Sequence, residues 1–387
     1  MSKSCGNTNI IMVSTDSYAG RGDAATVQST NRAKSISNNI DGKVTLVLRG
    51  SAGSKVCRDG AFDTLIINCK KYNNLFGKLF GIVRKNVQFF RLSCSQTKNS
   101  SAIYEIHNVL SLSGILLAKR YKKPIFFELN SPNEAEVLEN YRVTNPVITK
   151  IFSLLMKWEL KQSDHIFVQT KELKALIQQL YGPLPISIAP NGAYPPREFP
   201  VVANRKRLQC VYVTTIDRYH AVESILDTFS KISKVASLVL IGTGERLEEY
   251  KQKYAKYKNI NFTGRLPHES VLQYISNADF GLAQYNLSSA HFKKFGFYFC
   301  PMKMIEYASL GKPTVFIGTP NSVVSDFIKN KACINIVSNQ ALTELIVELA
   351  KSPRKLLIDT TNCARKFSQE YTWDKIAEHI VGVMNVH

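Results

Sequence analysis

A lysine and a glutamate, Lys303 and Glu306, stand three residues apart just after Pro301. Pro301 suits the first turn of a helix, Gly311 suits the position after its end, and residues 314–317 form an apolar run typical of a buried strand. The start of such a helix presents unpaired N–H groups and the positive end of its dipole, which fits a phosphate. The alternative is an ordinary helix and strand with two surface charges.

A glycine-containing loop follows the first predicted strand, at residues 9–14. Gly20 and Gly22 precede a predicted helix at 24–38, and the segment fits the dinucleotide fingerprint G-x-G-x-x-A. The next strand ends at Arg49 instead of the acidic residue that would hold the ribose of NAD, so an NAD(P) oxidoreductase is a distant alternative. We interpret the loop as a strand-to-helix turn whose backbone lies close to a ligand.

Strand and helix patterns alternate over most of the chain. They fall into a first domain at 1–193, a linker at 194–206 and a second domain at 207–370, with a last amphipathic helix at about 371–387. Two such alternations predict an α/β protein with two doubly wound, Rossmann-like parallel sheets. Ligands bind such sheets at the carboxyl ends of the strands, so we expect a cleft between the domains.

The chain is strongly basic. Fifty Lys and Arg residues against thirty Asp and Glu give a formal net charge of +20. This favours an anionic partner, and because no nucleic-acid motif is present we expect a membrane surface or a phosphorylated substrate and no nucleic acid. A lysine-rich genome composition is the alternative. No metal site is expected, because no cysteine or histidine cluster has zinc-like spacing.

The segment 70–85 has cationic flanks and an apolar helical face formed by Leu75, Phe76, Leu79, Phe80 and Val83. This is the profile of a helix that lies on an anionic membrane, although packing on its own sheet would give the same pattern. We expect a strand to follow at 87–92. No apolar run is long enough to span a bilayer and no signal peptide is visible, so we expect a cytoplasmic protein, with peripheral association at the inner face of the membrane as the further expectation.

Several segments, taken together and in order, resemble retaining GT-B glycosyltransferases of family 4 (glycosyl transferases group 1). Residues 297–307 are similar to the family's "FYFSPLKLFEY" version of its donor-site helix. Residues 127–132 resemble its "EVNAPL" segment, and Pro190-Asn-Gly is its usual "PNG". Further matching pieces lie at 238–245, 260–267 and 275–282.

The resemblance implies a hexosyltransferase-type, metal-independent enzyme without a cofactor. It would move a sugar from a nucleotide-diphosphate sugar to a glycan or lipid-linked saccharide acceptor, in surface polysaccharide or glycolipid biosynthesis. The chain has no Asp-x-Asp pair, which is the metal clamp of the other major glycosyltransferase fold. The chemistry then requires that the leaving diphosphate be stabilised and the acceptor hydroxyl be held in place.

The resemblance also implies roles for single residues. Glu306 would bind the ribose hydroxyls, and Lys303 with the N–H groups near Met302 would face the diphosphate. Asn130 or His107 would touch the transferred sugar or the acceptor, although a structural role is the alternative for the histidine. The full set of implied donor-binding positions is Gly20, Gly22, Gly242, Gly244, Arg265, Leu266, Pro301, Met302, Lys303 and Glu306. A plain strand-to-helix turn is the alternative for Gly242 and Gly244.

The chain departs from the family where a lysine normally binds the diphosphate. Thr214-Thr215 and His220-Ala221 occupy these positions, and Arg218 and His220 are the candidate replacement cations. Tyr298 stands where many members have a first glutamate. These departures keep two alternatives open: a catalytically weak, sugar-nucleotide-binding subunit, and a nucleotide-sugar epimerase on the same fold.

Overall fold

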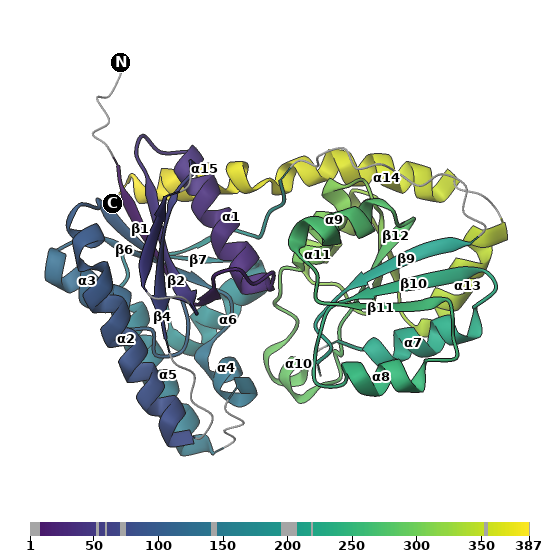
Figure 1. The fold of residues 1–387 in the computed structure, drawn as a ribbon, viewed down its shortest axis with the longest axis horizontal. Coiled ribbons are helices and arrows are strands. Elements are labelled where there is room, and N and C mark those ends of the chain that lie inside the picture. The colour runs from purple at the N-terminus through teal and green to yellow at the C-terminus, as the bar shows by residue number, and fades with distance from the viewer. Residues whose placement is uncertain are drawn as a thin grey trace. The chain divides into compact units, whose positions relative to one another are not determined.

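The computed structural model describes residues 8–51, 54–58, 60–69, 75–140, 145–194, 207–217, 220–351 and 355–386, and their side chains except those at 75–79, 139–140 and 355–357. The chain divides into two compact units, Met1–Pro190 with Trp373–His387, and Asn191–Thr372 (Figure 1). The boundaries expected at 193 and 370 lie close to these. The expected linker lies outside the described residues except for its first residue.

A mostly parallel sheet forms the centre of the first unit. Its strand order is β3-β4-β2-β1-β5-β6-β7-β8, and only the β3–β4 pair is antiparallel. The chain builds outward from β1 to β4 and then resumes at β5 on the other side of β1, so the order reverses between β1 and β5. The elements of this unit are β1 (Ile10–Tyr18), α1 (Ala24–Asn38), β2 (Val44–Gly50), β3 (Lys55–Arg58), β4 (Asp63–Asn68), α2 (Leu75–Lys98), β5 (Ala102–His107), α3 (Ser113–Tyr121), β6 (Ile125–Leu129), α4 (Asn133–Asn140), α5 (Pro146–Leu160), β7 (His165–Val168), α6 (Lys171–Tyr181), β8 (Ile186–Ile188) and α15 (Trp373–Met384).

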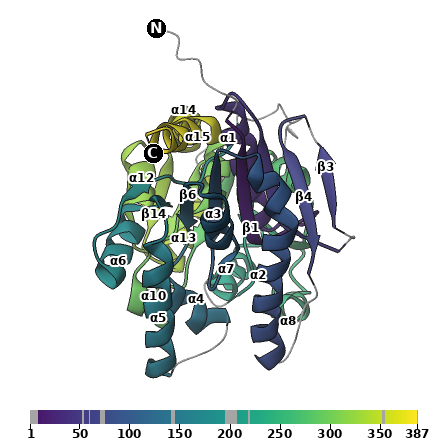
Figure 2. The ribbon, with the colours of Figure 1, turned by 90° about the vertical axis from the view of Figure 1, so that its left-hand side faces the viewer.

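Helices cover both faces of this sheet. Figure 2 shows α2, α3 and α5 in front of the sheet, while α1 and α15 lie behind it. Successive strand residues point to opposite faces, so Tyr104 and Ile106 pack with the core that includes Ile380 of α15, whereas His107 contacts α5 through Glu159. Trp373 and Ile380 are both buried, so α15 is part of the core of the first unit.

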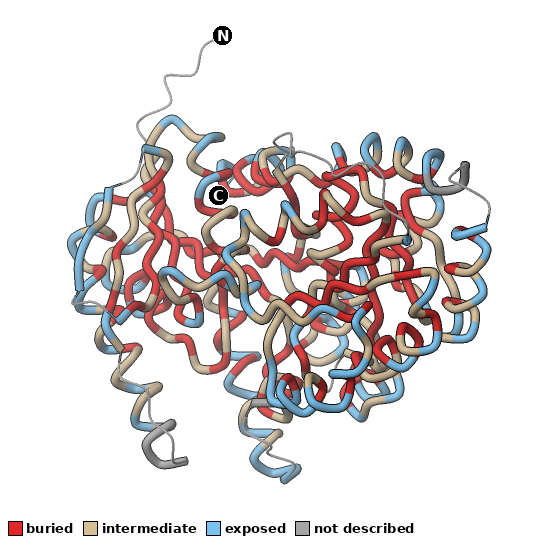
Figure 3. The backbone as a smooth tube through the Cα atoms, turned by 45° about the vertical axis from the view of Figure 1, so that its right-hand side comes forward, coloured by how far each residue is buried: buried red, intermediate tan, exposed pale blue. Residues whose placement is uncertain are grey.

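The second unit repeats the architecture with a smaller parallel sheet. Its order is β11-β10-β9-β12-β13-β14, and the order reverses between β9 and β12. Buried residues gather at the centre of each unit (Figure 3). The elements are β9 (Leu208–Val213), α7 (Val222–Lys231), β10 (Ala236–Ile241), α8 (Leu247–Lys253), β11 (Ile260–Gly264), α9 (His268–Ser276), β12 (Phe280–Gln284), α10 (Ala290–Phe295), α11 (Met302–Ser309), β13 (Thr314–Ile317), α12 (Ser322–Lys329), β14 (Cys333–Ile336), α13 (Asn339–Lys351), α14 (Lys355–Ser368) and a 3₁₀ turn (Gln369–Tyr371).

The strand expected at 87–92 is wrong, because these residues lie inside helix α2. Asn86, Phe89, Ser93 and Thr97 are buried while Val87 and Leu92 are exposed, which is a helical and not an alternating pattern. The β-branched and aromatic residues at 87–92 favour a strand locally. In the structure they belong to helix α2, and one face of this helix is buried against the sheet of the first unit. None of the described helices is long and apolar enough to cross a membrane.

Candidate functional site

The reversal of strand order in the second unit brings several of the expected residues together. Strand β9 leads into the segment that holds Asp217 and His220, and the neighbouring strand β12 leads into Tyr285. Helix α11 begins at Met302, with Pro301 as its N-cap, and no side chain caps its first N–H groups. In open parallel sheets this position at the carboxyl ends of the strands is the usual ligand site.

Lys303 carries a buried ammonium group in the first turn of α11. Its Nζ lies 5.0 Å from the ring centroid of Tyr212 and 5.3 Å from that of Tyr285, and it has no hydrogen-bond partner among the described residues. Burial lowers the pKa of Lys303 to about 7, although the charge of Asp217 acts in the opposite direction. A buried cation without a hydrogen-bond acceptor fits a site that an anionic ligand completes.

His220 belongs to the same cluster. Its Nδ1 lies 2.9 Å from Oδ1 of Asp217, and its ring packs against Tyr285 with centroids 5.0 Å apart. Burial and the charge of Lys303 lower the pKa of His220, while Asp217 opposes this. His220 and Lys303 thus lie against the same ring, that of Tyr285, and the role of His220 as a replacement cation stays a prediction. Arg218 lies outside the described residues, so its expected role stays a prediction.

Glu306 follows Lys303 by one helical turn and has a partner that the sequence did not reveal. Nε2 of His268, at the start of α9, lies 2.7 Å from Oε1 of Glu306. Burial opposes protonation of His268, but the hydrogen bond and charge of Glu306 prevail and raise its pKa. The side chains are 35% and 12% exposed, respectively, so a ligand can still reach the carboxylate.

Two glycine positions hold the neighbouring loops close together. A Cβ at Gly242 would lie 1.7 Å from the backbone oxygen of Thr214, and a Cβ at Gly244 would lie 1.9 Å from that of Ile216. Substitution at either position would therefore push the β10–α8 loop away from the loop after β9. The glycines are explained by this packing, and their contact with a nucleotide stays a prediction.

The remaining donor-site positions lie near these loops. Arg265 is exposed and reaches Thr243, with Nη2 3.5 Å from its Oγ1. Leu266 is partly buried against the core beneath α9. Tyr298, which replaces the family's first glutamate, is buried and packs against the rings of His291 and Phe299. Its environment is that of an aromatic core residue.

In the first unit, the loop after β1 is a strand-to-helix turn. Gly20 has a φ of +78°, a backbone conformation that favours glycine. Gly22 is exposed, and Asp23 caps α1 by accepting a hydrogen bond from the N–H of Thr26 at 3.0 Å. The turn that the sequence predicted is thus present, and its approach to a ligand stays a prediction.

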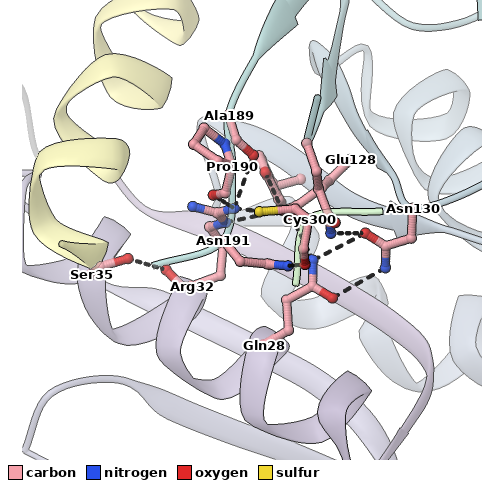
Figure 4. A network of polar contacts seen from close by, with 11 residues as sticks. Gln28, Arg32, Ser35, Glu128, Asn130, Ala189, Pro190, Asn191 and Cys300 are labelled. Atoms are coloured by element: carbon pink, nitrogen blue, oxygen red, sulfur yellow. Dashed lines mark hydrogen bonds and ion pairs between the residues drawn. The ribbon is translucent and has the colours of Figure 1, made fainter. Parts of the chain in front are cut away.

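Asn130 lies at the carboxyl end of β6 within a network of amides (Figure 4). It exchanges two hydrogen bonds of 3.1 Å with Gln28 of α1, and its Oδ1 also accepts one from Nε2 of Gln169. The side chain is therefore held in one orientation at the edge of the sheet where a ligand would bind. Its proposed contact with a sugar stays a prediction.

A buried ion pair supports this network. Arg32 donates from Nε and Nη2 to the two carboxylate oxygens of Glu128, both at 3.0 Å, and neither side chain is exposed. Tyr104 donates to the same carboxylate at 2.6 Å, and Trp373 of α15 lies under the guanidinium at 4.9 Å. The pair thus joins α1, β6, β5 and α15 in one unit.

His107 lies inside the first unit, with no exposed side-chain surface. It forms ion pairs with Glu159 of α5 at 3.2 Å and with Glu105 at 3.4 Å. Burial alone would lower the pKa of His107, but the two carboxylates prevail and raise it to about 10. The ring links α5 to the sheet. Its proposed contact with an acceptor stays a prediction that this burial argues against.

The sequence reasoning did not identify Glu136, a carboxyl near the strand reversal of the first unit. It accepts a hydrogen bond from Ser131 at 2.5 Å and one from the N–H of Val109, just after β5, at 3.4 Å. Burial raises the pKa of Glu136 to about 7. The available signal was Ser131-Pro at the start of a helix with Glu136 in its first turn. No group of three or more metal-ligating side chains occurs in the described part of the chain.

Comparisons with known proteins bear on the fold and on the family of the second unit. Residues 207–352 match the family model described as glycosyl transferases group 1. No curated protein sequence matches the chain. Solved structures that resemble it include sucrose-phosphate synthase from Thermosynechococcus elongatus (TM-score 0.76, 15% identity, 98% of each chain covered).

Two further similar structures are named for glycosyl transfer or its donor. WaaG, described as a glycosyltransferase involved in lipopolysaccharide biosynthesis, has a TM-score of 0.70 at 12% identity, covering 96% of this chain and 99% of that one. Anabaena Alr3699/HepE in complex with UDP-glucose has a TM-score of 0.68 at 11% identity, covering 97% and 100%. The chain therefore has the GT-B fold, and its second unit carries the match to group 1 glycosyltransferases.

Proposed function

We propose that this protein is a retaining, metal-independent glycosyltransferase that moves a sugar from a nucleotide-diphosphate sugar to a glycan or lipid-linked saccharide acceptor. The observation that carries the proposal is the buried Lys303 ammonium, which lies beside His220 at the start of α11 without a described hydrogen-bond acceptor. A diphosphate supplies the missing negative charge. The family match of the second unit and the UDP-glucose complex of Alr3699/HepE support a nucleotide sugar as the donor.

In the proposed reaction an acceptor hydroxyl oxygen bonds to the anomeric carbon, on the face from which the diphosphate leaves, as the bond from that carbon to the diphosphate breaks. The electron pair leaves with the diphosphate, and an oxygen of the departing diphosphate takes the proton of the hydroxyl. Lys303, the N–H groups at the start of α11 and His220, which the bound diphosphate helps to keep protonated against its lowered pKa, stabilise that charge. Glu306 holds the ribose, and Asn130 holds the transferred sugar or the acceptor.

A catalytically weak, sugar-nucleotide-binding subunit is the second candidate. Thr214-Thr215 and His220-Ala221 favour it, because the fixed cation of the family is absent there. A nucleotide-sugar epimerase on the same fold differs in needing no acceptor. We further propose that the enzyme acts in surface polysaccharide or glycolipid synthesis in the cytoplasm, at the inner face of a membrane that the segment 70–85 contacts.

The test is a thermal-shift and nucleotide-release screen with UDP-, GDP- and dTDP-sugars. The wild type is compared with Glu306→Ala and with Glu348→Ala, a matched control at an exposed position of α13. A donor that raises the Tm and releases nucleotide in the wild type and control but not in Glu306→Ala supports the transferase. Binding without turnover, even with lipid-linked acceptors, supports the binding subunit, and no binding at all contradicts the donor site.

A further inference from the structure

Most of the large hydrophobic side chains exposed in the described residues lie on three helices of the first unit. We define the α2–α3–α5 surface by Phe80, Val83, Val87, Leu116, Val147, Ile148, Ile151, Leu154, Leu155 and Trp158. The side chains of Val83 and Val147 are 62% and 66% exposed. So much apolar surface on neighbouring helices usually marks an interaction site.

Helix α5 contributes the largest part. Val147, Ile151, Leu154 and Trp158 follow one another at spacings of four, three and four residues, so they form a single stripe along the helix. Lys150 and Lys157 of the helix and Lys161, its C-cap, are exposed and form a parallel stripe next to the apolar one. Helix α5 therefore has two apolar faces, one buried and one exposed. One face packs on its unit, and the other presents apolar and cationic side chains to solvent.

Helix α2 shows the same combination. Phe80, Val83, Val87 and Arg91 are exposed at spacings of three, four and four residues. Helix α3 lies between the two larger helices. It packs against α2, and its Lys119 lies 5.2 Å from the ring centroid of Trp158 of α5. Its Leu116 is exposed and adds to the apolar surface. The three helices form one layer on the same face of the sheet (Figure 2).

The charge of this layer has one sign. Residues 75–123 and 146–161 contain twelve Lys and Arg but only two acidic residues, Glu105 and Glu159. Both carboxylates are buried around His107 and do not reach the surface. The exposed charge of the layer is therefore entirely positive within the described side chains. A second copy of the same surface would be repelled by it, whereas an anionic surface would be attracted.

The layer also projects from its unit. The lower ends of α2 and α5, which are their N-terminal ends, extend past the sheet in the same direction in both ribbon views (Figures 1 and 2). These ends lie on the side of the carboxyl ends of the strands. A flat partner can therefore contact both helices together.

We propose that the α2–α3–α5 surface docks on the face of an anionic lipid bilayer, with the apolar stripes of α2 and α5 inserted among the lipids and the lysines at the headgroups. Amphipathic helices with apolar and cationic exposed faces bind such interfaces through buried apolar area and attraction to anionic lipid. Helix α5 becomes the principal contact, which goes beyond the segment 70–85. The binding needs no nucleotide sugar.

The test is flotation of the full-length protein with vesicles of phosphatidylcholine alone or mixed with phosphatidylglycerol, at low and high ionic strength. We expect the wild type to bind the mixed vesicles and to be released by salt. Ile151→Asp with Leu154→Asp should lower the partition coefficient by roughly tenfold or more. Lys150, Lys157 and Lys161 changed together to Ala should lower it by roughly tenfold to a hundredfold.

Matched controls separate the surface from general effects. Val337→Asp with Ile358→Asp places the same two charges at exposed apolar positions of the second unit, and Ala at Lys258, Lys329 and Lys351 removes the same charge from exposed positions there. Both should bind like the wild type.

Equal binding to neutral vesicles, no binding, or unchanged binding of the α5 variants overturns the proposal. A wild-type dimer that the Ile151→Asp, Leu154→Asp variant dissociates, without vesicle binding, would make the surface a contact between copies. The donor thermal shift, measured on the same proteins, reports on the proposed function separately.

Discussion

Nε2 of His268 lies 2.7 Å from Oε1 of Glu306, and this contact joins the start of α9 to the donor-site helix α11. A hydrogen bond to one carboxylate oxygen restricts rotation of the group and leaves the other oxygen for a ligand. If Glu306 binds the ribose, His268 acts through it as a positioning residue. His268 would then change the affinity for the donor without touching it, because it fixes the orientation of the carboxylate that does.

The first prediction concerns His268. His268→Phe removes the hydrogen bond and should weaken donor binding about tenfold, since an unpaired charged group loses roughly that much. His268→Gln keeps a donor and should recover most of the affinity. Isothermal titration with the donor found in the screen measures both, and kcat should change less than KM. Equal losses in Phe and Gln variants would show that the histidine matters only for packing.

The second prediction is a pH dependence of donor binding. The pKa of Lys303 is about 7 without a ligand, and a diphosphate must raise it. Donor binding should then take up a proton at Lys303 above pH 7, so the affinity should fall by up to about tenfold per pH unit there. Below pH 7 the contribution of Lys303 levels off, and any further gain in affinity comes from protonation of His220, whose pKa is lowered. Titration at several pH values measures these slopes. Lys303→Met should bind weakly with a flat profile above pH 7, and an equally steep profile there in that variant would assign the proton to another group.

The sequence predicted the elements of the sheets well because their signals are local. The helix expected at 24–38 has these bounds in the structure, and the run at 314–317 is strand β13. The strand expected at 87–92 is wrong because several buried positions of α2 are polar: Asn86, Ser93 and Thr97. The spacing of the apolar residues alone therefore did not reveal the buried face of the helix. Packing partners that are distant in sequence decided that segment.

The candidate site was predictable to the same extent. Lys303 was identified because Pro301 and Gly311 bracket a short helix, and this signal is local. The contact between His268 and Glu306 joins residues 38 positions apart and depends on where the β11–α9 loop lies. Glu128, a charge within the apolar strand β6, was a visible sign of a buried ion pair, but its partner Arg32 could not be identified without the sheet order.

A third prediction concerns stability. In the unfolded chain a lysine has a pKa of about 10.4, whereas that of Lys303 in the fold is about 7. Between these values the unfolded state binds more protons, so this group makes the protein more stable as pH rises from 7 to about 10, and its cost is greatest below 7. Lys303→Met should therefore raise the Tm at pH 7 by more than at pH 10. A constant difference across this range would contradict the lowered pKa.

The fourth prediction concerns the buried ion pair of Arg32 and Glu128. Arg32→Met leaves a buried carboxylate without its counter-charge and should lower the free energy of unfolding by about 3–5 kcal/mol. Changing Arg32 and Glu128 together to Met should cost less than the single change, because no unpaired charge remains. Chemical denaturation of the three proteins gives the comparison. A double variant that is less stable than Arg32→Met would mean that the pair contributes net stability beyond satisfying its charges.

The last prediction concerns α15, which follows the second unit in sequence but completes the core of the first. Ile376, Ala377, Ile380 and Val381 pack with residues of β1, β2 and α1, and Trp373 lies under Arg32. A chain that ends at Thr372 exposes this core and leaves the guanidinium without its ring, so the Tm should fall sharply or the protein should not fold. Because the control chain that ends at Met384 keeps the whole helix, it should melt like the wild type. If the chain that ends at Thr372 melts at the wild-type temperature, α15 does not stabilise the first unit.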